Sequence, residues 1–111
     1  MLKNFRTYQL AVSFHRSCLE QEGVPGHLRD QLYRASGSIV LNLAEGSAKP
    51  TRKDQAKFYF VAMGSLRESQ AALEFVREDC SSLKIEADRL GASIYRLIQS
   101  TEVSESRFWK K

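Results

Sequence analysis

One segment carries four polar residues at spacings of four, four and three: Arg34, Ser38, Asn42 and Glu45. In a helix this spacing places their side chains on one face. Ser65 and Glu68 in the following segment would meet them across a helix pair. Paired carboxylates can serve acid–base chemistry, yet no His or Cys stands beside Glu45 or Glu68 in the sequence. We therefore predict no catalytic residues and a structural polar network, made of Ser38, Asn42, Glu45, Ser65 and Glu68.

The histidines and cysteines give no stronger sign of chemistry. His15 falls among apolar residues at helical spacing, which is typical of a core histidine with a hydrogen-bond partner. His27 and Asp30 form an i,i+3 pair near an expected helix start, which is typical of capping. Cys18 and Cys80 belong to no CxxC pattern, so we expect two buried, reduced thiols. The sequence thus predicts no enzyme, no metal and no cofactor.

Three groups of turn-forming residues, at 22–26, 46–51 and 79–82, divide the chain into four segments. Apolar residues recur every three or four positions within each segment, and the alternation typical of strands is absent. We predict helices over 6–21, 27–47, 52–79 and 83–100, the third with Thr51 as its N-cap. Short loops between four helices predict an all-α, antiparallel up-down four-helix bundle. It would be one domain over residues 1–100, followed by a C-terminal tail at 101–111.

The composition is that of a small basic globular protein. The chain has 111 residues, of which 42% are hydrophobic, enough for a single core. Its net charge of +4 favours an acidic partner such as nucleic acid. The longest uncharged stretch covers only 35–44, whereas a bilayer span needs roughly 20 apolar residues. Charged residues also interrupt the region where a signal peptide would be apolar. We therefore expect a cytoplasmic protein that does not contact a membrane.

The two middle helices carry more apolar residues than one core can bury. Residues 58–63 are apolar without a break, and at about 100° per residue they point in every direction around a helix. Large exposed apolar patches usually mark interfaces, so we predict a homo-oligomer. Its interface residues would be Val40, Leu41, Tyr59, Phe60 and Met63. The alternative is that Tyr59 and Phe60 are simply tolerated at the surface.

Charge is distributed unevenly along the predicted bundle. An up-down topology places the loop between the second and third helices at the same end as both termini. Lys and Arg outnumber Asp and Glu at that end, and the reverse holds at the other. Parallel protomers would combine these ends into one basic face, which is suited to a phosphate backbone. The candidate contacts are Arg34, Lys49, Arg52, Lys53 and Lys57, and the alternative is that 49–57 is only a solvated loop.

The last five residues, Arg107-Phe108-Trp109-Lys110-Lys111, combine aromatic and cationic side chains. Such a tail could stack on bases, dock on a neighbouring protomer or remain disordered. The sequence leaves these three alternatives open.

Three stretches together resemble a known family. The run YRASGSIVLNLAEGS at 33–47 contains an Asn-x-Ala-Glu-Gly element at 42–46. A second block begins with Phe58-Tyr59 and continues through Ala62 to 64–68, and Phe5-Arg6 and Tyr8-Gln9 form the opening. These residues resemble the four-helix-bundle proteins of intervening sequences in bacterial 23S rRNA genes, over nearly all of 1–100.

The resemblance implies a bundle that assembles into a ring, typically a pentamer. Similar proteins include the accessory variability determinant of diversity-generating retroelements, a basic ring that binds nucleic acid and a partner reverse transcriptase. Two functional hypotheses follow. The first is a non-enzymatic, oligomeric RNA- or DNA-binding accessory protein, with a reverse transcriptase as partner. The alternative is a protein-interaction scaffold of the same family that has no role with nucleic acid.

Overall fold

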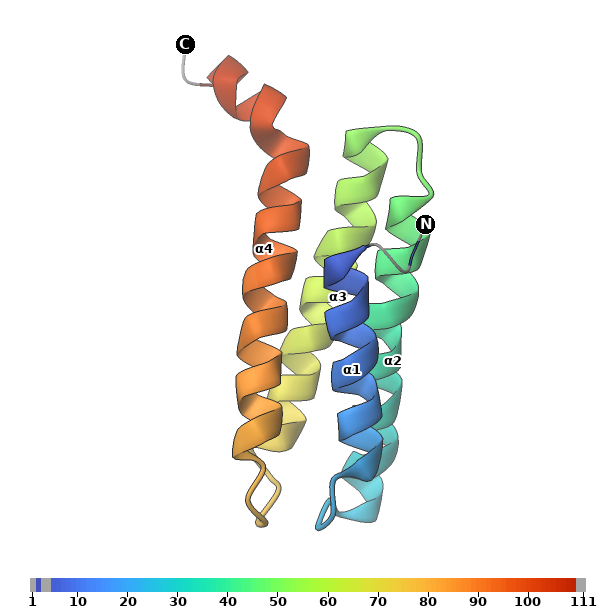
Figure 1. The fold of residues 1–111 in the computed structure, drawn as a ribbon, viewed down its shortest axis with the longest axis vertical. Coiled ribbons are helices and arrows are strands. Elements are labelled where there is room, and N and C mark those ends of the chain that lie inside the picture. The colour runs from blue at the N-terminus through green and yellow to red at the C-terminus, as the bar shows by residue number, and fades with distance from the viewer. Residues whose placement is uncertain (1, 3–4, 110–111) are drawn as a thin grey trace.

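The protein folds into four helices joined by short loops (Figure 1). The computed structural model describes residue 2 and residues 5–109, with side chains as far as Thr101. The helices are α1 (Arg6–Glu20), α2 (Gly26–Ser47), α3 (Arg52–Leu73) and α4 (Ser81–Trp109). No residue in the described part of the chain is in a strand. The predicted all-α four-helix fold is confirmed.

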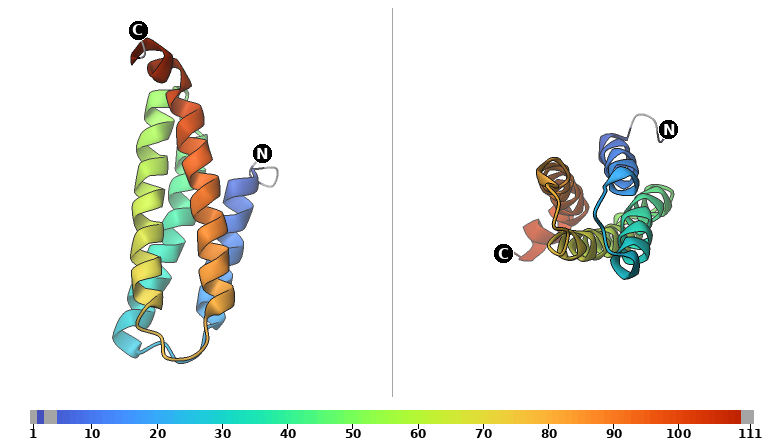
Figure 2. Two further views of the ribbon diagram at one scale, coloured as in Figure 1. Left: turned by 90° about the vertical axis from the view of Figure 1, so that its left-hand side faces the viewer. Right: turned by 90° about the horizontal axis from the view of Figure 1, so that it is seen from below.

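The helices lie around a common axis, and each packs on the neighbours before and after it, with α1 and α4 closing the bundle (Figure 2). The core between them consists of side chains from all four helices that are fully excluded from solvent. The largest are Phe14, Ile39, Leu43, Leu66, Leu90 and Ile94. Burial of a side chain of this size stabilises the fold by roughly 1.5–3 kcal/mol. The apolar residues at helical spacing therefore specify the bundle.

The helix ends follow from local hydrogen bonds. Thr51 caps α3 as predicted, because its hydroxyl accepts the Asp54 amide at 3.2 Å. The prediction that α3 continues to residue 79 was wrong, because the helix ends at Leu73. The next amides turn back to carbonyls three residues earlier, as Phe75 N–H does to Ala72 at 3.1 Å. The Asp79 carboxylate then accepts the Ser81 amide at 2.9 Å, and α4 begins there.

The fourth helix is longer than predicted. It passes residue 100, where the sequence suggested an end, and continues to Trp109. Its last turns extend beyond the other three helices (Figure 1). The side chains of residues 102–111, which make up all but the first residue of the predicted tail, lie outside the described part of the chain.

The topology gives the bundle two distinct ends. The α2–α3 loop lies at the same end as both termini, and the α1–α2 and α3–α4 loops lie together at the other (Figure 1). At that second end Gly23 has φ 79°, and the Glu78 carboxylate occupies the space that a Cβ atom of residue 23 would need. This contact joins the two loops. None of the described helical segments combines the length and the hydropathy that a span of the bilayer requires.

Candidate nucleic-acid interface and its surroundings

Cations gather around the α2–α3 loop. Arg52 and Lys53 are exposed on the first turn of α3, where the unpaired amides of the helix add partial positive charge. No carboxylate in the described part of the chain lies within ion-pair distance of either residue. Lys57, one turn further on, is 3.7 Å from Asp54 and remains largely exposed. Among the described cations around this loop, Arg52 and Lys53 are therefore the most available to a ligand.

Lys49 is held by several contacts at the end of α2. Its Nζ atom lies 3.1 Å from Glu45 Oε2 and 5.1 Å from the centre of the Phe58 ring. Its amide donates to Gly46 O at 3.1 Å, and its carbonyl accepts from Gln55 Nε2 at 3.1 Å. Both the backbone and the ammonium group are thus fixed, and a third of the side chain stays exposed.

The structure separates Arg34 from these cations. Arg34 is exposed on α2, fifteen residues before Lys49. That spacing corresponds to about 22 Å along a helix. Arg34 therefore lies apart from Lys49, Arg52, Lys53 and Lys57, and its contact with nucleic acid stays a prediction.

Three of the five residues predicted to form a polar network are brought together. Asn42 Nδ2 donates to the carbonyl of Ser38 at 2.8 Å and to its hydroxyl at 3.0 Å. The Ser65 hydroxyl reaches across from α3 to the Ser38 hydroxyl at 2.9 Å. Glu45 instead pairs with Lys49, and Glu68 is exposed on α3. The network links α2 to α3 and contains no acid–base pair.

The predicted interface residues divide into three groups. Leu41 and Phe60 are 71% and 54% exposed, which fits a surface that another chain covers. Val40 and Met63 are half-buried against the core. Tyr59 is only 4% exposed, so its assignment to the interface is corrected. It shares the core stripe of α3 with Ala62 and Leu66, at spacings of three and four.

Sequence reasoning missed a second apolar surface, on α1 and α2. Leu19 and Tyr33 are 45% and 52% exposed, and the His15 ring lies edge-on to the Tyr33 ring with 5.2 Å between centroids. Leu19 recurs at helical spacing with the apolar residues of α1, yet its side chain lies outside the core. The sequence offers one indication of this exposure: Leu19 directly follows Cys18, and the Cys18 side chain is the one of the two that is buried.

His15 is a partly buried histidine with a partner, as expected. Its Nδ1 atom lies 2.7 Å from the Ser36 hydroxyl, which itself donates to Tyr33 O at 3.2 Å. Because that hydroxyl has only one hydrogen, we assign the ring hydrogen to Nδ1. Burial lowers the pKa of His15 below its usual value. Burial also raises the pKa of the Cys18 thiol to about 12, which leaves the thiol protonated.

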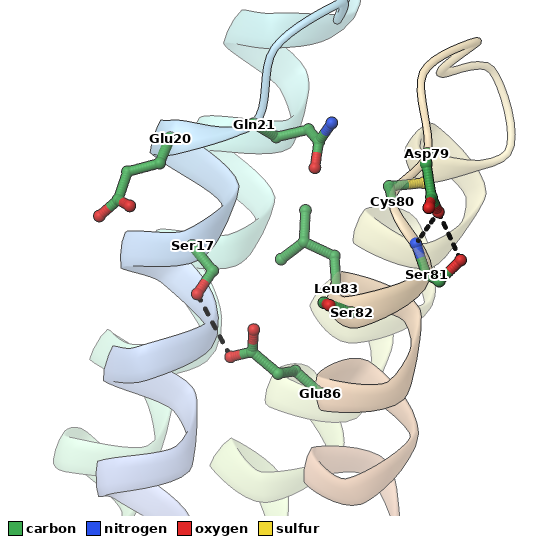
Figure 3. A pocket seen from close by; sticks show the side chains of 9 residues that line it. All are labelled: Ser17, Glu20, Gln21, Asp79, Cys80, Ser81, Ser82, Leu83 and Glu86. Atoms are coloured by element: carbon green, nitrogen blue, oxygen red, sulfur yellow. Dashed lines mark hydrogen bonds between the residues drawn. The ribbon is translucent and has the colours of Figure 1, made fainter.

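A polar pocket of about 310 Å³ lies at the opposite end of the bundle (Figure 3). Inside the pocket, the Ser17 hydroxyl donates a hydrogen bond to the Glu86 carboxylate at 3.3 Å. The Asp79 carboxylate accepts hydrogen bonds from the amide and the hydroxyl of Ser81. The buried thiol of Cys80 is directed to Leu73 O at 3.8 Å. Among the described residues, no group of His, Cys, Asp and Glu is arranged to hold a metal ion. The pocket therefore offers no activated nucleophile.

These features define an up-down four-helix-bundle protein with one basic end. The family model of the 23S rRNA-intervening sequence protein matches residues 3–101. The chain belongs to this family, as its sequence resemblance indicated. Among curated proteins, none matches the chain.

Proposed function

We propose that the protein is a homo-oligomer that binds the sugar–phosphate backbone of RNA or DNA through its basic end. The observation that carries this proposal is the position of Arg52 and Lys53 on the first turn of α3, where both are exposed and neither is paired with a carboxylate of the described residues. Lys49 and Lys57 flank them. Contacts of this kind neutralise phosphates and release counterions, so they bind without reading the base sequence.

Assembly would bring the basic ends of several protomers together on one face. Closed rings form through two different surfaces on each protomer, one fitting the other on the next copy. The exposed apolar side chains available for two such surfaces include Leu19 on α1, Tyr33 and Leu41 on α2, and Phe60 and Val61 on α3. Copies related by an axis parallel to the bundle would bring their α2–α3 loops to one face. A ring of five is the size that the family resemblance implies.

A filter-binding titration tests the nucleic-acid part of the proposal. The probe is a labelled 30-nucleotide single-stranded RNA, titrated from 50 to 300 mM KCl. We expect wild-type affinity to fall steeply with salt, and the R52A/K53A variant to bind more weakly with a slope reduced by roughly 0.7 per lost phosphate contact. R29A/R77A removes the same charge from exposed residues at the opposite end and should bind like wild type. Absent or salt-independent binding would reject the proposal.

Light scattering tests the assembly. We expect an oligomer at micromolar concentration, and dissociation when Leu41 or Phe60 is replaced by Asn, because each change puts a polar group into the apolar contact. A strictly monomeric wild-type protein would reject the assembly without bearing on Arg52 and Lys53.

The exposed apolar surfaces also support the second candidate, a scaffold whose partner is another protein. A pull-down performed with and without nuclease separates the two functions. Recovery of nucleic acid, and of a reverse transcriptase that leaves with it after nuclease, favours the accessory role. A protein partner that remains bound after nuclease, with no nucleic acid recovered, favours the scaffold.

A further inference from the structure

Three residues of the Asn-x-Ala-Glu-Gly element each make a distinct contact. Asn42 joins the polar network with Ser38. Glu45 pairs with Lys49. Gly46 leaves room for α3, because a Cβ atom there would lie 2.6 Å from the Tyr59 ring and 3.0 Å from Phe58 Cβ. The second half of the element therefore shapes the surroundings of Lys49 at the basic end.

The Lys49 ammonium group sits between an anion and an aromatic face. The close approach of α2 and α3 at Gly46 brings the Phe58 ring to one side of it, and the Glu45 carboxylate lies at 3.1 Å. An ammonium group has three N–H donors, so a carboxylate and a ring face leave part of it open to another acceptor. The Glu45 side chain is 54% exposed, and solvent therefore reaches the ion pair.

We propose that Glu45 is a built-in competitor for phosphate at Lys49, an inference that rests on the proposed binding of nucleic acid. In the free protein its carboxylate occupies the anion position beside the ammonium group. A backbone phosphate that arrives there displaces Glu45, while Phe58 keeps Lys49 in place. Glu45 is thus a positioning residue that weakens binding and limits it to ligands held by further contacts.

The neighbouring cations differ from Lys49 in how closely a carboxylate partner lies to them. Among the residues whose side chains the structure describes, no carboxylate pairs with Arg52 or Lys53, so these two cations meet a phosphate directly. Lys57 has Asp54 at the longer distance of 3.7 Å, and its side chain is 68% exposed against 33% for Lys49. Lys49 is therefore the cation at which an internal anion has most effect.

The test is a double-mutant cycle with the same 30-nucleotide RNA. Glu45→Gln keeps the shape of the side chain and removes its charge. We expect E45Q to bind roughly two- to fivefold more tightly at 100 mM KCl, the worth of an exposed ion pair, with a salt slope steeper by up to about 0.7. E68Q is the matched control, since it removes an exposed carboxylate from α3, and its change should be smaller. In the K49A background, E45Q should give no gain.

The outcomes distinguish the role of Glu45 as a competitor from the proposed binding of nucleic acid at the basic end. Equal effects of E45Q and E68Q, or a gain from E45Q that persists without Lys49, would overturn the role of Glu45 and leave the basic end intact. Unchanged binding by R52A/K53A would instead overturn the proposed interface. If the wild-type protein does not bind the RNA, both the proposed interface and the role of Glu45 are rejected.

Discussion

The Tyr59 ring lies against the backbone of Gly46, so closely that a Cβ atom at position 46 would come within 2.6 Å of ring atom Cε1. Alanine normally stabilises a helix interior by about 1 kcal/mol relative to glycine. Here the neighbour is the Tyr59 ring, which is buried in the core. The packing of α2 on α3 therefore opposes the intrinsic preference of the helix.

We expect Gly46→Ala to lower the free energy of unfolding by about 1–3 kcal/mol, the usual effect of overpacking. Urea unfolding at a fixed protein concentration measures the change. Gly26→Ala is the control, because nothing lies within 4 Å of a Cβ atom there, and it should cause no loss. A G46A variant as stable as wild type would show that α2 and α3 approach less closely.

The Thr7–Ser93 hydrogen bond should contribute to stability as a pair. The two buried hydroxyl oxygens are 2.6 Å apart and join α1 to α4. Removing one partner leaves the other buried and unpaired, so Thr7→Val and Ser93→Ala should each destabilise by about 1–2 kcal/mol. The T7V/S93A variant should lose clearly less than the sum, as measured by a double-mutant cycle in urea. Strict additivity would mean that the two residues act separately.

The Cys18 thiol should be inert in the folded protein. Only the thiolate reacts with alkylating reagents, and burial raises the pKa of Cys18 to about 12 from 9.0. We expect no modification of a C80S variant by iodoacetamide at pH 8 and rapid modification in urea, followed by mass spectrometry. The raised pKa also means that the contribution of this thiol to stability is present below pH 9 and is lost as the pH rises toward 12. Fast labelling of the native variant would contradict the burial.

His15 should make the protein less stable in mild acid. Burial lowers the pKa of His15 from 6.5, so the folded state disfavours the protonated ring. Its contribution to stability is therefore complete above pH 6.5 and is lost as the pH falls through the folded pKa. We expect His15→Asn, which can still donate to Ser36, to flatten that part of the pH profile of unfolding. His27→Gln, at an exposed position, should leave the profile as it is in wild type.

The helix order was predictable because apolar spacing and loop residues agree over long segments, and Thr51 marks the start of α3 in the sequence. The end of α3 was not predictable from the same pattern. Phe75 and Val76 continue the apolar series that a helix would show, but the backbone leaves the helix after Leu73. The Asp79–Ser81 cap then decides where α4 begins, and sequence spacing does not indicate that turn.

The interface residues illustrate a similar limit. An unbroken apolar run at 58–63 indicates excess apolar surface but not which residues face inward. Packing against Gly46 turns Tyr59 into the core and leaves Phe60 outside. For the basic end, the sequence identified the cations around the loop, whereas the pairing of Lys49 with Glu45 and its place over Phe58 depend on how α2 meets α3.

The hydrogen bond between Thr7 and Ser93 joins residues 86 positions apart in the chain. Closing so long a loop lowers the chain entropy more than forming the local α2–α3 hairpin. Polar side chains contribute to the α1–α4 seam, with Ser13 and Ser17 both directed to Glu86. The seam between α1 and α4 should therefore close after the local helix pairs have formed, as the last step in which the bundle becomes complete.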